Sequence, residues 1–306
     1  MSSRACVIYN PVAGRGHAAR VVESAVRESP DPITLMPTTH PGHAEELAAD
    51  AVLQGFTRII AAGGDGTVHE VANGMLRVMP HEAALSVWPL GSGNDYAFAT
   101  GLLTGWKPEY RYLPRRTELV DVGRITGGRK LRYFVNGMGL GFNAAVTLES
   151  RKISFLRGMA LYGTAIMRAM IWHWVAPMMR IAFDATIVES PTFGLTINVG
   201  QREGAFPLTP KASLTDGLFD CIHTNRLSRI GLMRLSGAMT TGNIPQPHPH
   251  VTTHRCQSVE IQASVPVRVH LDGEFFCQPE EGITNLRVET LPGHLRVERF
   301  DPPAIG

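Results

Sequence analysis

Residues 58–69 read Arg-Ile-Ile-Ala-Ala-Gly-Gly-Asp-Gly-Thr-Val-His, an apolar run followed at once by a glycine-rich turn. The glycines Gly63, Gly64 and Gly66 can adopt positive φ and let a polyanion approach the backbone amides. A helical pattern starts near Val68, and a helix N-terminus carries partial positive charge. The stretch therefore predicts a strand, a phosphate-binding turn and a helix. Ordinary turn chemistry, with glycine at positive φ and aspartate in an Asx-turn, is the alternative interpretation.

The same alternation of strand and helix runs through the first hundred residues. Strands are expected at 7–9, 33–36, 58–62 and 84–88, with helices at 18–27, 44–54 and 68–78. Such βα units form an open α/β sheet, which binds ligands outside the carboxyl ends of its strands. A polar or glycine-rich loop follows each strand, so we expect four loops to meet at one edge: 10–16, 38–42, 63–67 and 89–95.

From about Leu119 the pattern changes to short runs of β-branched and aromatic residues separated by Gly, Pro, Asn or Asp. This pattern is typical of a β-rich domain. Strands are expected at 132–136, 180–185, 195–199, 218–223, 259–262, 267–271 and 286–290. One helical insert is expected, at about 156–175.

Composition excludes several classes of protein. A formal net charge of +2 over 306 residues, without a long basic run, argues against a nucleic-acid partner. Four widely spaced cysteines and a strand-like run at 5–9 in place of a signal peptide favour the cytoplasm. The apolar stretch 165–179 is too short and too polar to cross a bilayer. Its Trp172 and Trp174 could sit at a lipid interface, but a buried helix is the favoured interpretation.

The second glycine-rich turn, residues 89–95, adds Ser92, Asn94 and Asp95 at the same predicted sheet edge. Amides and hydroxyls can hold phosphate oxygens, and carboxylates can hold Mg²⁺ or an acceptor hydroxyl. Alternatively, Asn94 or Asp95 is the N-cap of a helix at 96–100. The chain has no G-x-x-x-x-G-K-[ST] motif, so any nucleotide is bound by another scheme.

Six segments in order resemble the soluble lipid kinase family, the diacylglycerol kinase catalytic domain shared with sphingoid-base kinases and bacterial lipid kinases. They are VIYNPVAGRG (7–16), GGDGTVHEVANGM (63–75), PLGSGNDYAFATGL (89–102), DVGRI (121–125), PKASLTDGLFD (210–220) and LDGE (271–274). The resemblance implies an N-terminal NAD-kinase-like α/β domain and a C-terminal β-sandwich domain, with ATP and lipid meeting between them. The implied α/β nucleotide-binding domain is 1–120 with a C-terminal return at about 292–306. The implied lipid-binding domain is 121–291.

The resemblance also implies roles for individual residues. Glu274 matches the general base, and Asp65 is expected to take part in catalysis with it. The nucleotide-contact positions are Asn10, Thr38, Gly63, Gly64, Asp65, Gly66, Thr67, Val68, His69 and Ser92. Asp95 and Asp121 match supporting carboxylates, and three carboxylates near one site would repel unless a cation such as Mg²⁺ shared them. A second metal site is implied at Asp216 with the carbonyls of Ser213 and Leu218, although Asp216-Gly217 could be a simple turn.

The expected function is transfer of phosphate from ATP to a lipid hydroxyl at the membrane surface, as in phospholipid biosynthesis. Departures from the family pattern at His69, Gln201 and 205–206 put the acceptor in doubt more than the phosphoryl chemistry. The alternatives are a soluble NAD kinase and a nucleotide- or lipid-binding module without turnover. The residues do not name the acceptor lipid, and they leave a homodimer open.

Overall fold

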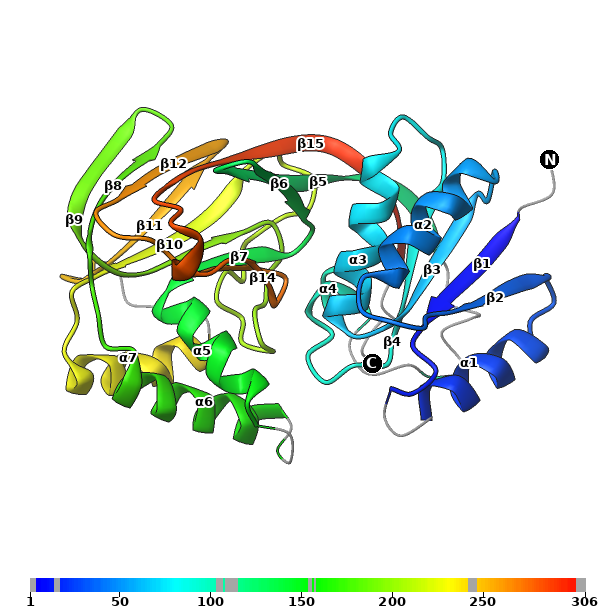
Figure 1. The fold of residues 1–306 in the computed structure, drawn as a ribbon, viewed down its shortest axis with the longest axis horizontal. Helices are drawn as coiled ribbons and strands as arrows, with labels where there is room; N and C mark the ends of the chain where they lie inside the picture. The colour runs from blue at the N-terminus through cyan, green and yellow to red at the C-terminus, as the bar shows by residue number, and fades with distance from the viewer. Residues whose placement is uncertain are drawn as a thin grey trace. The chain divides into compact units, whose positions relative to one another are not determined.

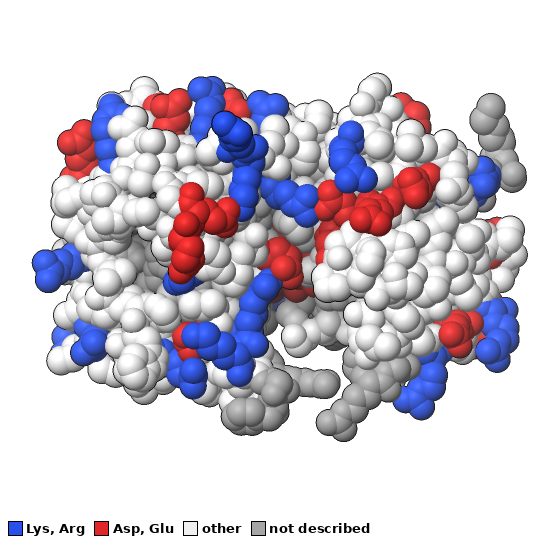
Figure 2. Space-filling model, in the orientation of Figure 1, with Lys and Arg blue, Asp and Glu red and all other residues white. Residues whose placement is uncertain are grey.

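The structure is a computed structural model of the chain and describes residues 4–13, 17–102, 107, 115–153, 156, 158–241 and 247–300. Part of the first predicted loop, 14–16, and the end of the predicted C-terminal return, 301–306, lie outside the described residues. The chain divides into two compact units, Met1–Val120 with Gly293–Gly306 (unit 1) and Asp121–Pro292 (unit 2). Side chains of both charge signs occur on the visible face of each unit (Figure 2).

Unit 1 is an α/β domain, as the sequence predicts (Figure 1). Its parallel strands are β1 (Ala5–Tyr9), β2 (Ile33–Pro37), β3 (Arg58–Gly63) and β4 (Ala84–Pro89), in the order β4-β3-β1-β2. Its helices are α1 (His17–Arg27), α2 (His43–Leu53), α3 (Asp65–Arg77) and α4 (Asp95–Ala99). The end of β15 (Asn285–Phe300) extends this sheet, with Val297 opposite Leu85 in parallel register.

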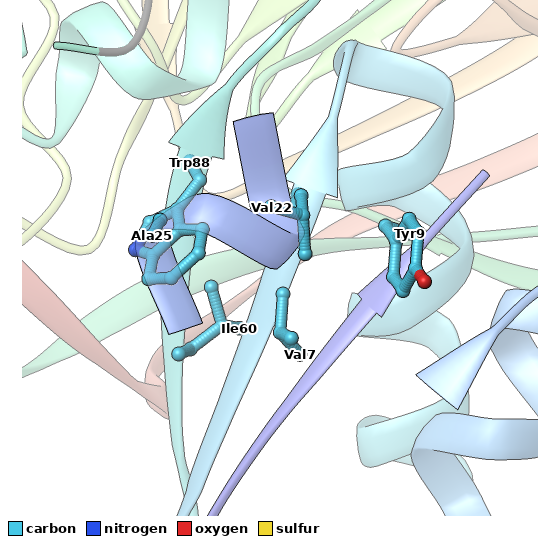
Figure 3. Packing of buried hydrophobic residues seen from close by; sticks show 7 residues of the cluster. Val7, Tyr9, Val22, Ala25, Ile60 and Trp88 are labelled. Atoms are coloured by element: carbon cyan, nitrogen blue, oxygen red, sulfur yellow. The ribbon is translucent and has the colours of Figure 1, made fainter. Parts of the chain in front are cut away.

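Packing on both faces of this sheet explains why its central strands are almost wholly apolar. On one face Val22 and Ala25 of α1 pack against Val7, Ile60 and Trp88 (Figure 3). On the α2–α3 side, a Cβ at Gly74 of α3 would stand 2.1 Å from the carbonyl oxygen of Glu45 in α2. Glycine at that position lets the two helices approach closely.

Unit 2 is β-rich and contains the antiparallel pairs of a sandwich. One series runs β14 (Glu274–Cys277), β13 (Val269–Leu271), β7 (Gly137–Gly141), β9 (Thr186–Asn198), β10 (Phe219–Asn225) and β11 (Val251–Cys256). A second runs β9, β8 (Met178–Phe183), β12 (Ser258–Ala263), β15, β5 (Arg115–Gly127) and β6 (Lys130–Phe134). The long strand β9 joins the two, because 186–191 pair with β8 and 192–198 pair with β10.

The helices of unit 2 differ from the expectation of a single insert at 156–175. The described residues of unit 2 form three α-helices, α5 (Phe142–Arg151), α6 (Gly158–Trp172) and α7 (Arg229–Thr241), besides the short 3-10 helix η2 (Pro279–Glu281). The single-insert prediction was wrong because α5 follows β7 directly and α7 carries Gly, Ser and Thr that weaken its helical pattern. None of the helices in these described stretches has the length and apolar character needed to cross a bilayer.

Candidate functional site

The turn after β3 differs in detail from its prediction. Helix α3 begins at Asp65 and not near Val68, so Asp65, Gly66 and Thr67 form its first turn. Gly64 is the N-cap with an extended backbone, φ −91° and ψ −172°. These glycines therefore do not use the positive φ that is open to them, since Gly66 is helical and Gly63 also lies outside the left-handed region. The N-cap residue Gly64 makes no side-chain cap hydrogen bond, which suits a helix end that holds an anion.

Close approach by neighbouring atoms explains Gly63 and Gly91 instead. A Cβ at Gly63 would stand 2.3 Å from Thr67 Oγ1, and a Cβ at Gly91 would stand 2.4 Å from the Cα of Gly64. The amide of Leu90 donates to the Gly63 carbonyl at 2.9 Å. The two glycine-rich loops thus approach each other backbone to backbone at Gly64 and Gly91.

Asn94 shapes the second loop from the left-handed region, with φ 54°. Its side chain accepts a hydrogen bond from the Gly91 amide and donates one to the Gly91 carbonyl, both at 2.9 Å. Asn94 stands at the N-cap of α4, as one alternative predicted, but its side chain closes the loop and makes no cap bond. Asp65 Oδ1 accepts from the Tyr96 amide in α4 at 3.2 Å, so an α3 carboxylate takes the capping role.

Two of the predicted carboxylates lie against the same glycine. An ideal Cβ on Gly93 would be 2.8 Å from Asp65 Oδ2 and 3.7 Å from Asp95 Oδ2. Mg²⁺ is bound in kinases by one or two carboxylates together with substrate phosphates. The donor set at Gly93 therefore fits a magnesium ion in type, although no group of three or more His, Cys, Asp or Glu residues in the described chain forms a metal cage.

The remaining predicted residues of unit 1 are placed at the same sheet edge, but unequally. Asn10 follows β1 and is exposed, with its Oδ1 accepting from the Val12 amide at 3.0 Å. Thr38 follows the neighbouring β2, and Ser92 follows β4 and is exposed. Val68 and His69 are 2% exposed, and the His69 ring lies 3.4 Å from Asn73 Nδ2 inside the helix.

Glu274 is presented in unit 2 by a two-residue hairpin. Asp272 and Gly273 have φ of 51° and 87° and connect β13 to β14, the tight turn that Asp-Gly predicts. The Asp272 carboxylate accepts from the amides of Val135, Asn136 and Gly137 at 2.9–3.0 Å. A single carboxylate thus fixes both the hairpin and the segment that leads into β7.

Arg151, at the end of α5, contacts Glu274 directly. Its Nη2 lies 2.6 Å from Glu274 Oε2 and donates to the Gly273 carbonyl at 2.6 Å. Its guanidinium also lies 4.8 Å from the centre of the Phe275 ring. The Glu274 side chain is 45% exposed, so it combines a fixed position with access to solvent.

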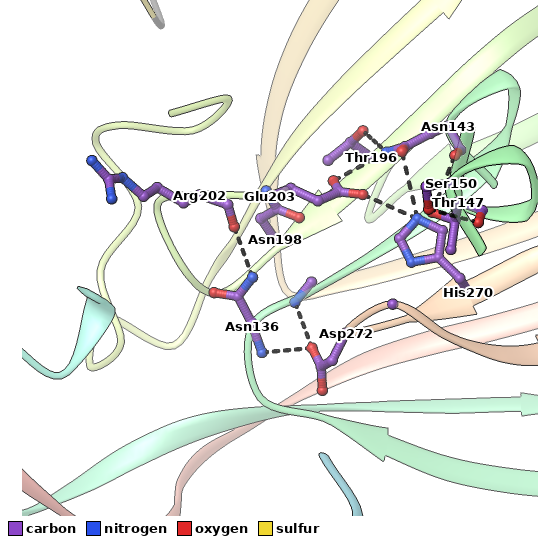
Figure 4. A network of polar contacts seen from close by, with 12 residues as sticks. Asn136, Asn143, Thr147, Ser150, Thr196, Asn198, Arg202, Glu203, His270 and Asp272 are labelled. Atoms are coloured by element: carbon purple, nitrogen blue, oxygen red, sulfur yellow. Dashed lines mark hydrogen bonds and ion pairs between the residues drawn. The ribbon is translucent and has the colours of Figure 1, made fainter. Parts of the chain in front are cut away.

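A polar network behind this hairpin escaped the sequence analysis (Figure 4). Glu203 Oε1 lies 3.0 Å from His270 Nε2, and Asn143 donates to Glu203 Oε2 at 3.0 Å and to Thr196 Oγ1 at 2.9 Å. His270 is 1% exposed. These residues come from separate segments, so no local motif could have joined them.

Asp121 and Asp216 both act on the turn at 214–218. Asp121 is 2% exposed, and its Oδ2 accepts from the Gly217 amide at 2.6 Å. Asp216 Oδ1 accepts from the Leu218 amide at 3.1 Å, while its Oδ2 pairs with Arg255. Asp121 therefore holds the turn in place.

The second predicted metal site does not fit this arrangement. Arg255 also lies 3.6 Å from Asp220. Burial raises the pKa of Asp220, and the nearby guanidinium partly offsets this rise. A cation at Asp216 would have to displace this arginine. Asp216 is predicted to bind metal together with the Ser213 and Leu218 carbonyls, but its carboxylate pairs with Arg255. Ser213 Oγ accepts a hydrogen bond from the Thr215 amide at 3.3 Å.

Two departures from the family pattern have visible consequences. Gln201 Nε2 donates to the Ala212 carbonyl at 3.3 Å, next to the turn just described. Gly204 and Ala205 both have positive φ, 60° and 69°, in the turn that joins Glu203 to Phe206. Ala205 therefore occupies a conformation that glycine adopts more easily.

Comparison with known proteins covers almost the whole chain. Residues 4–125 match the diacylglycerol kinase catalytic domain, and residues 137–299 match the YegS C-terminal NAD kinase beta sandwich-like domain. A diacylglycerol kinase of Bacillus subtilis is 28% identical over 89% of this chain and 90% of its own length. A probable lipid kinase YegS-like of Pseudomonas aeruginosa is 30% identical over 95% and 92%, respectively.

The fold has matching solved structures. A putative diacylglycerol kinase from Bacillus anthracis superposes with a TM-score of 0.77 at 20% identity, covering 98% of this chain and 97% of that chain. A yeast NADH kinase superposes with a TM-score of 0.52 at 10% identity, covering 98% and 84%. At these identities the likeness concerns the fold alone, an N-terminal α/β domain followed by a β-sandwich domain.

Proposed function

Because the chain belongs to the family of diacylglycerol kinase catalytic domains and YegS-like lipid kinases, we propose that it transfers the γ-phosphate of ATP to a lipid hydroxyl. Diacylglycerol is the first acceptor to test, with a related glycerolipid or a sphingoid base as the other candidates. The observation that carries the proposal is the contact between Gly64 and Gly91, which brings the two glycine-rich loops together beside the carboxylates of Asp65 and Asp95.

Unit 1 would bind the donor. The backbone at 63–67 and the exposed Ser92 and Asn10 offer amides, a hydroxyl and a side-chain amide to phosphate oxygens. Asp65 and Asp95 would hold Mg²⁺, which when bound neutralises charge on the β- and γ-phosphates. The bond from Asp65 to the Tyr96 amide keeps that carboxylate oriented before any ligand arrives.

Unit 2 would supply the base. The lipid oxygen forms a bond to the γ-phosphorus, the bond from that phosphorus to the departing ADP oxygen breaks, and Glu274 accepts the hydroxyl proton. Arg151 holds the Glu274 carboxylate through its 2.6 Å contact, and the Asp272-Gly273 turn sets the backbone beneath it. Arg151 and the Asp272-Gly273 turn both belong to unit 2, so they hold Glu274 in place in the absence of nucleotide.

The test is transfer of labelled phosphate from ATP to diacylglycerol, phosphatidylglycerol or sphingosine in mixed micelles, with NAD in solution as a fourth acceptor. Glu274→Gln is expected to lower kcat by about 100-fold or more, in the range that a general base contributes. Glu260→Gln is the matched control, because Glu260 is an exposed carboxylate of the same unit paired with Arg287.

Two results would overturn the proposal. One is the absence of label on every lipid under conditions in which the protein is folded. The other is equal activity of the Glu274 and Glu260 variants. Label on NAD alone would assign the chain to the soluble NAD kinase reaction instead.

A further inference from the structure

Helices α6 and α7 expose a group of large apolar side chains. On α6 and the turn that follows it, the exposed fractions are 57% for Met167, 61% for Ile171, 71% for Trp172 and 67% for Val175. On α7, Ile230 and Met233 are 60% and 54% exposed. We call these six residues, with the exposed arginines that flank them, the α6–α7 face.

The α6–α7 face is the outer side of helices that are firmly packed on their inner side. Met170 of α6 and Leu232 and Leu235 of α7 are buried in one cluster with Phe193 of β9. The two helices also meet directly, since Arg229 Nε donates to the Met170 carbonyl at 3.2 Å. The exposed residues are therefore a surplus of apolar surface beyond what the core requires.

The two tryptophans of the stretch 165–179 have different environments. The expectation of a buried helix was wrong for this stretch, because of the two only Trp174, which follows α6 and is partly buried, packs inward. Its ring centre lies 4.5 Å from that of Phe193 and 5.8 Å from that of Phe142. Trp172 points outward and is 71% exposed. An exposed tryptophan beside aliphatic side chains is typical of the boundary between water and lipid.

The charged residues in the sequence of α6 and α7 have one sign. The sequence contains no Asp or Glu between Glu149 and Asp184, or between Asp220 and Glu260. On and before α7, Arg226, Arg229 and Arg234 are exposed. In Figure 2 the surface over α6 and α7, at the lower left, is mostly uncharged with Lys and Arg side chains beside it.

The acidic residue nearest to α6 in sequence is directed inward. The Glu149 carboxylate is 1% exposed and contacts Lys152 at 2.6 Å, Arg168 at 2.7 Å and His173 at 3.1 Å. Burial would raise the pKa of Glu149, but these hydrogen bonds outweigh burial and lower its pKa to about 2. Glu149 thus ties α6 to α5 and presents no negative charge at the surface.

We propose that the α6–α7 face docks on an anionic phospholipid bilayer, with Trp172 and Ile171 entering the interface and the arginines of α7 meeting the headgroups. Apolar side chains flanked by cations are the combination that binds anionic membranes from one side. A second copy of the chain is a poor complement, since two such faces would bring arginines together without acidic partners. The inference goes beyond the proposed function, because binding to a bilayer requires no phosphoryl transfer.

The experiment measures sedimentation with sucrose-loaded vesicles of phosphatidylcholine alone or with 30 mol% phosphatidylglycerol. The full chain is expected to sediment mainly with the anionic vesicles. The double variant Ile171→Ser with Trp172→Ser is expected to lower the partition coefficient about tenfold or more. Arg226→Gln and Arg234→Gln are each expected to lower it about fivefold on anionic vesicles only.

The matched control is Leu131→Ser with Ile187→Ser, which removes two apolar side chains of unit 2 that are 50% and 53% exposed but lie outside α6 and α7. It is expected to bind vesicles like the wild-type chain. Equal binding by the control and the Ile171/Trp172 variant would overturn the proposal. So would a change from dimer to monomer in that variant with vesicle binding intact, which would make the face a contact between copies.

Failure of this inference can be told apart from failure of the proposed function. Glu274→Gln is expected to lose activity and to keep vesicle binding. The Ile171/Trp172 variant is expected to keep activity on a short-chain, water-soluble diacylglycerol and to lose it on the same lipid class in vesicles. Loss of activity on both substrates with unchanged vesicle binding would contradict the docking role.

Discussion

Replacing Asp272 by asparagine isolates the effect of one carboxylate on the hairpin that carries Glu274. Asparagine tolerates the left-handed φ of 51° as well as aspartate does, so the backbone is not strained by the change. Its oxygen can still accept from the amides of Asn136 and Gly137, at 2.9 Å in the wild-type chain. Its NH₂ group, however, would face the Val135 amide, which now donates at 3.0 Å.

The magnitude follows from these three bonds. The Val135 residue is 1% exposed, and an unsatisfied buried amide costs about 1–3 kcal/mol. Two further bonds change from charge-assisted to neutral, which roughly halves their strength. We therefore expect the segment 135–137 to lose about 2–4 kcal/mol of local stability.

Hydrogen exchange followed by mass spectrometry measures this loss where it occurs. A local loss of about 2 kcal/mol accelerates amide exchange about 30-fold, since about 1.4 kcal/mol corresponds to a factor of ten. Peptides covering 132–140 should show the acceleration, and peptides covering β3 in unit 1 should not. Exchange in 132–140 within threefold of the wild-type rate would refute the role assigned to Asp272.

Three further substitutions test other parts of the structure. Ala205→Gly should stabilise unit 2 by about 0.5–1 kcal/mol in thermal unfolding, because it relieves a φ of 69°, and a loss of stability would contradict this reading. Gly91→Ala should destabilise unit 1 by about 1–3 kcal/mol, because the added methyl group clashes with the Gly64 backbone. The control Gly163→Ala, at an open helical position, should be neutral or stabilising. Similar unfolding temperatures for the two variants would argue against the loop contact. The folded-state pKa of Glu149, about 2, lies below the unfolded value of 4.5, so Glu149 contributes about 3 kcal/mol of stability that is present above pH 4.5 and lost as the pH falls toward 2. In a denaturant titration at several pH values, Glu149→Gln should therefore reduce the fall in unfolding free energy at acid pH. An unchanged fall would count against the ion pairs.

The sheet edge of unit 1 could be predicted because its signals are local. Each parallel strand is an apolar run followed by its own polar loop, and parallel strands bring their carboxyl ends to one edge. The Asp272-Gly273 hairpin was predictable for the same reason, since a two-residue Asp-Gly turn is read from adjacent residues. The steric requirement for glycine at positions 64 and 91 was not predictable. The contact of Gly64 with Gly91 joins two loops, so the sequence of either loop alone does not indicate it.

Unit 2 was harder to predict because its decisive contacts span long distances in sequence. The bonds of Asn143 to Thr196 and Glu203 join residues 53 and 60 positions apart, and Asp272 reaches amides more than 130 positions away. Arg255, which pairs with Asp216, belongs to a strand 39 positions further on. A local motif around Asp216 could not reveal this pairing with Arg255.

Strand β15 is shared by the two units, and this has a consequence for how the chain folds during synthesis. Its residues 285–289 pair with β12 in unit 2, and Val297 pairs with Leu85 in unit 1. Glu298 also supplies the 2.9 Å ion-pair partner of Arg58, a side chain that is only 15% exposed. As the ribosome releases the chain from its N-terminus, β4 and Arg58 must wait without these partners until residue 298 has emerged. Unit 1 is therefore encoded first but completed last, and residues 1–120 expressed alone would retain an unpaired strand edge that invites association with other chains.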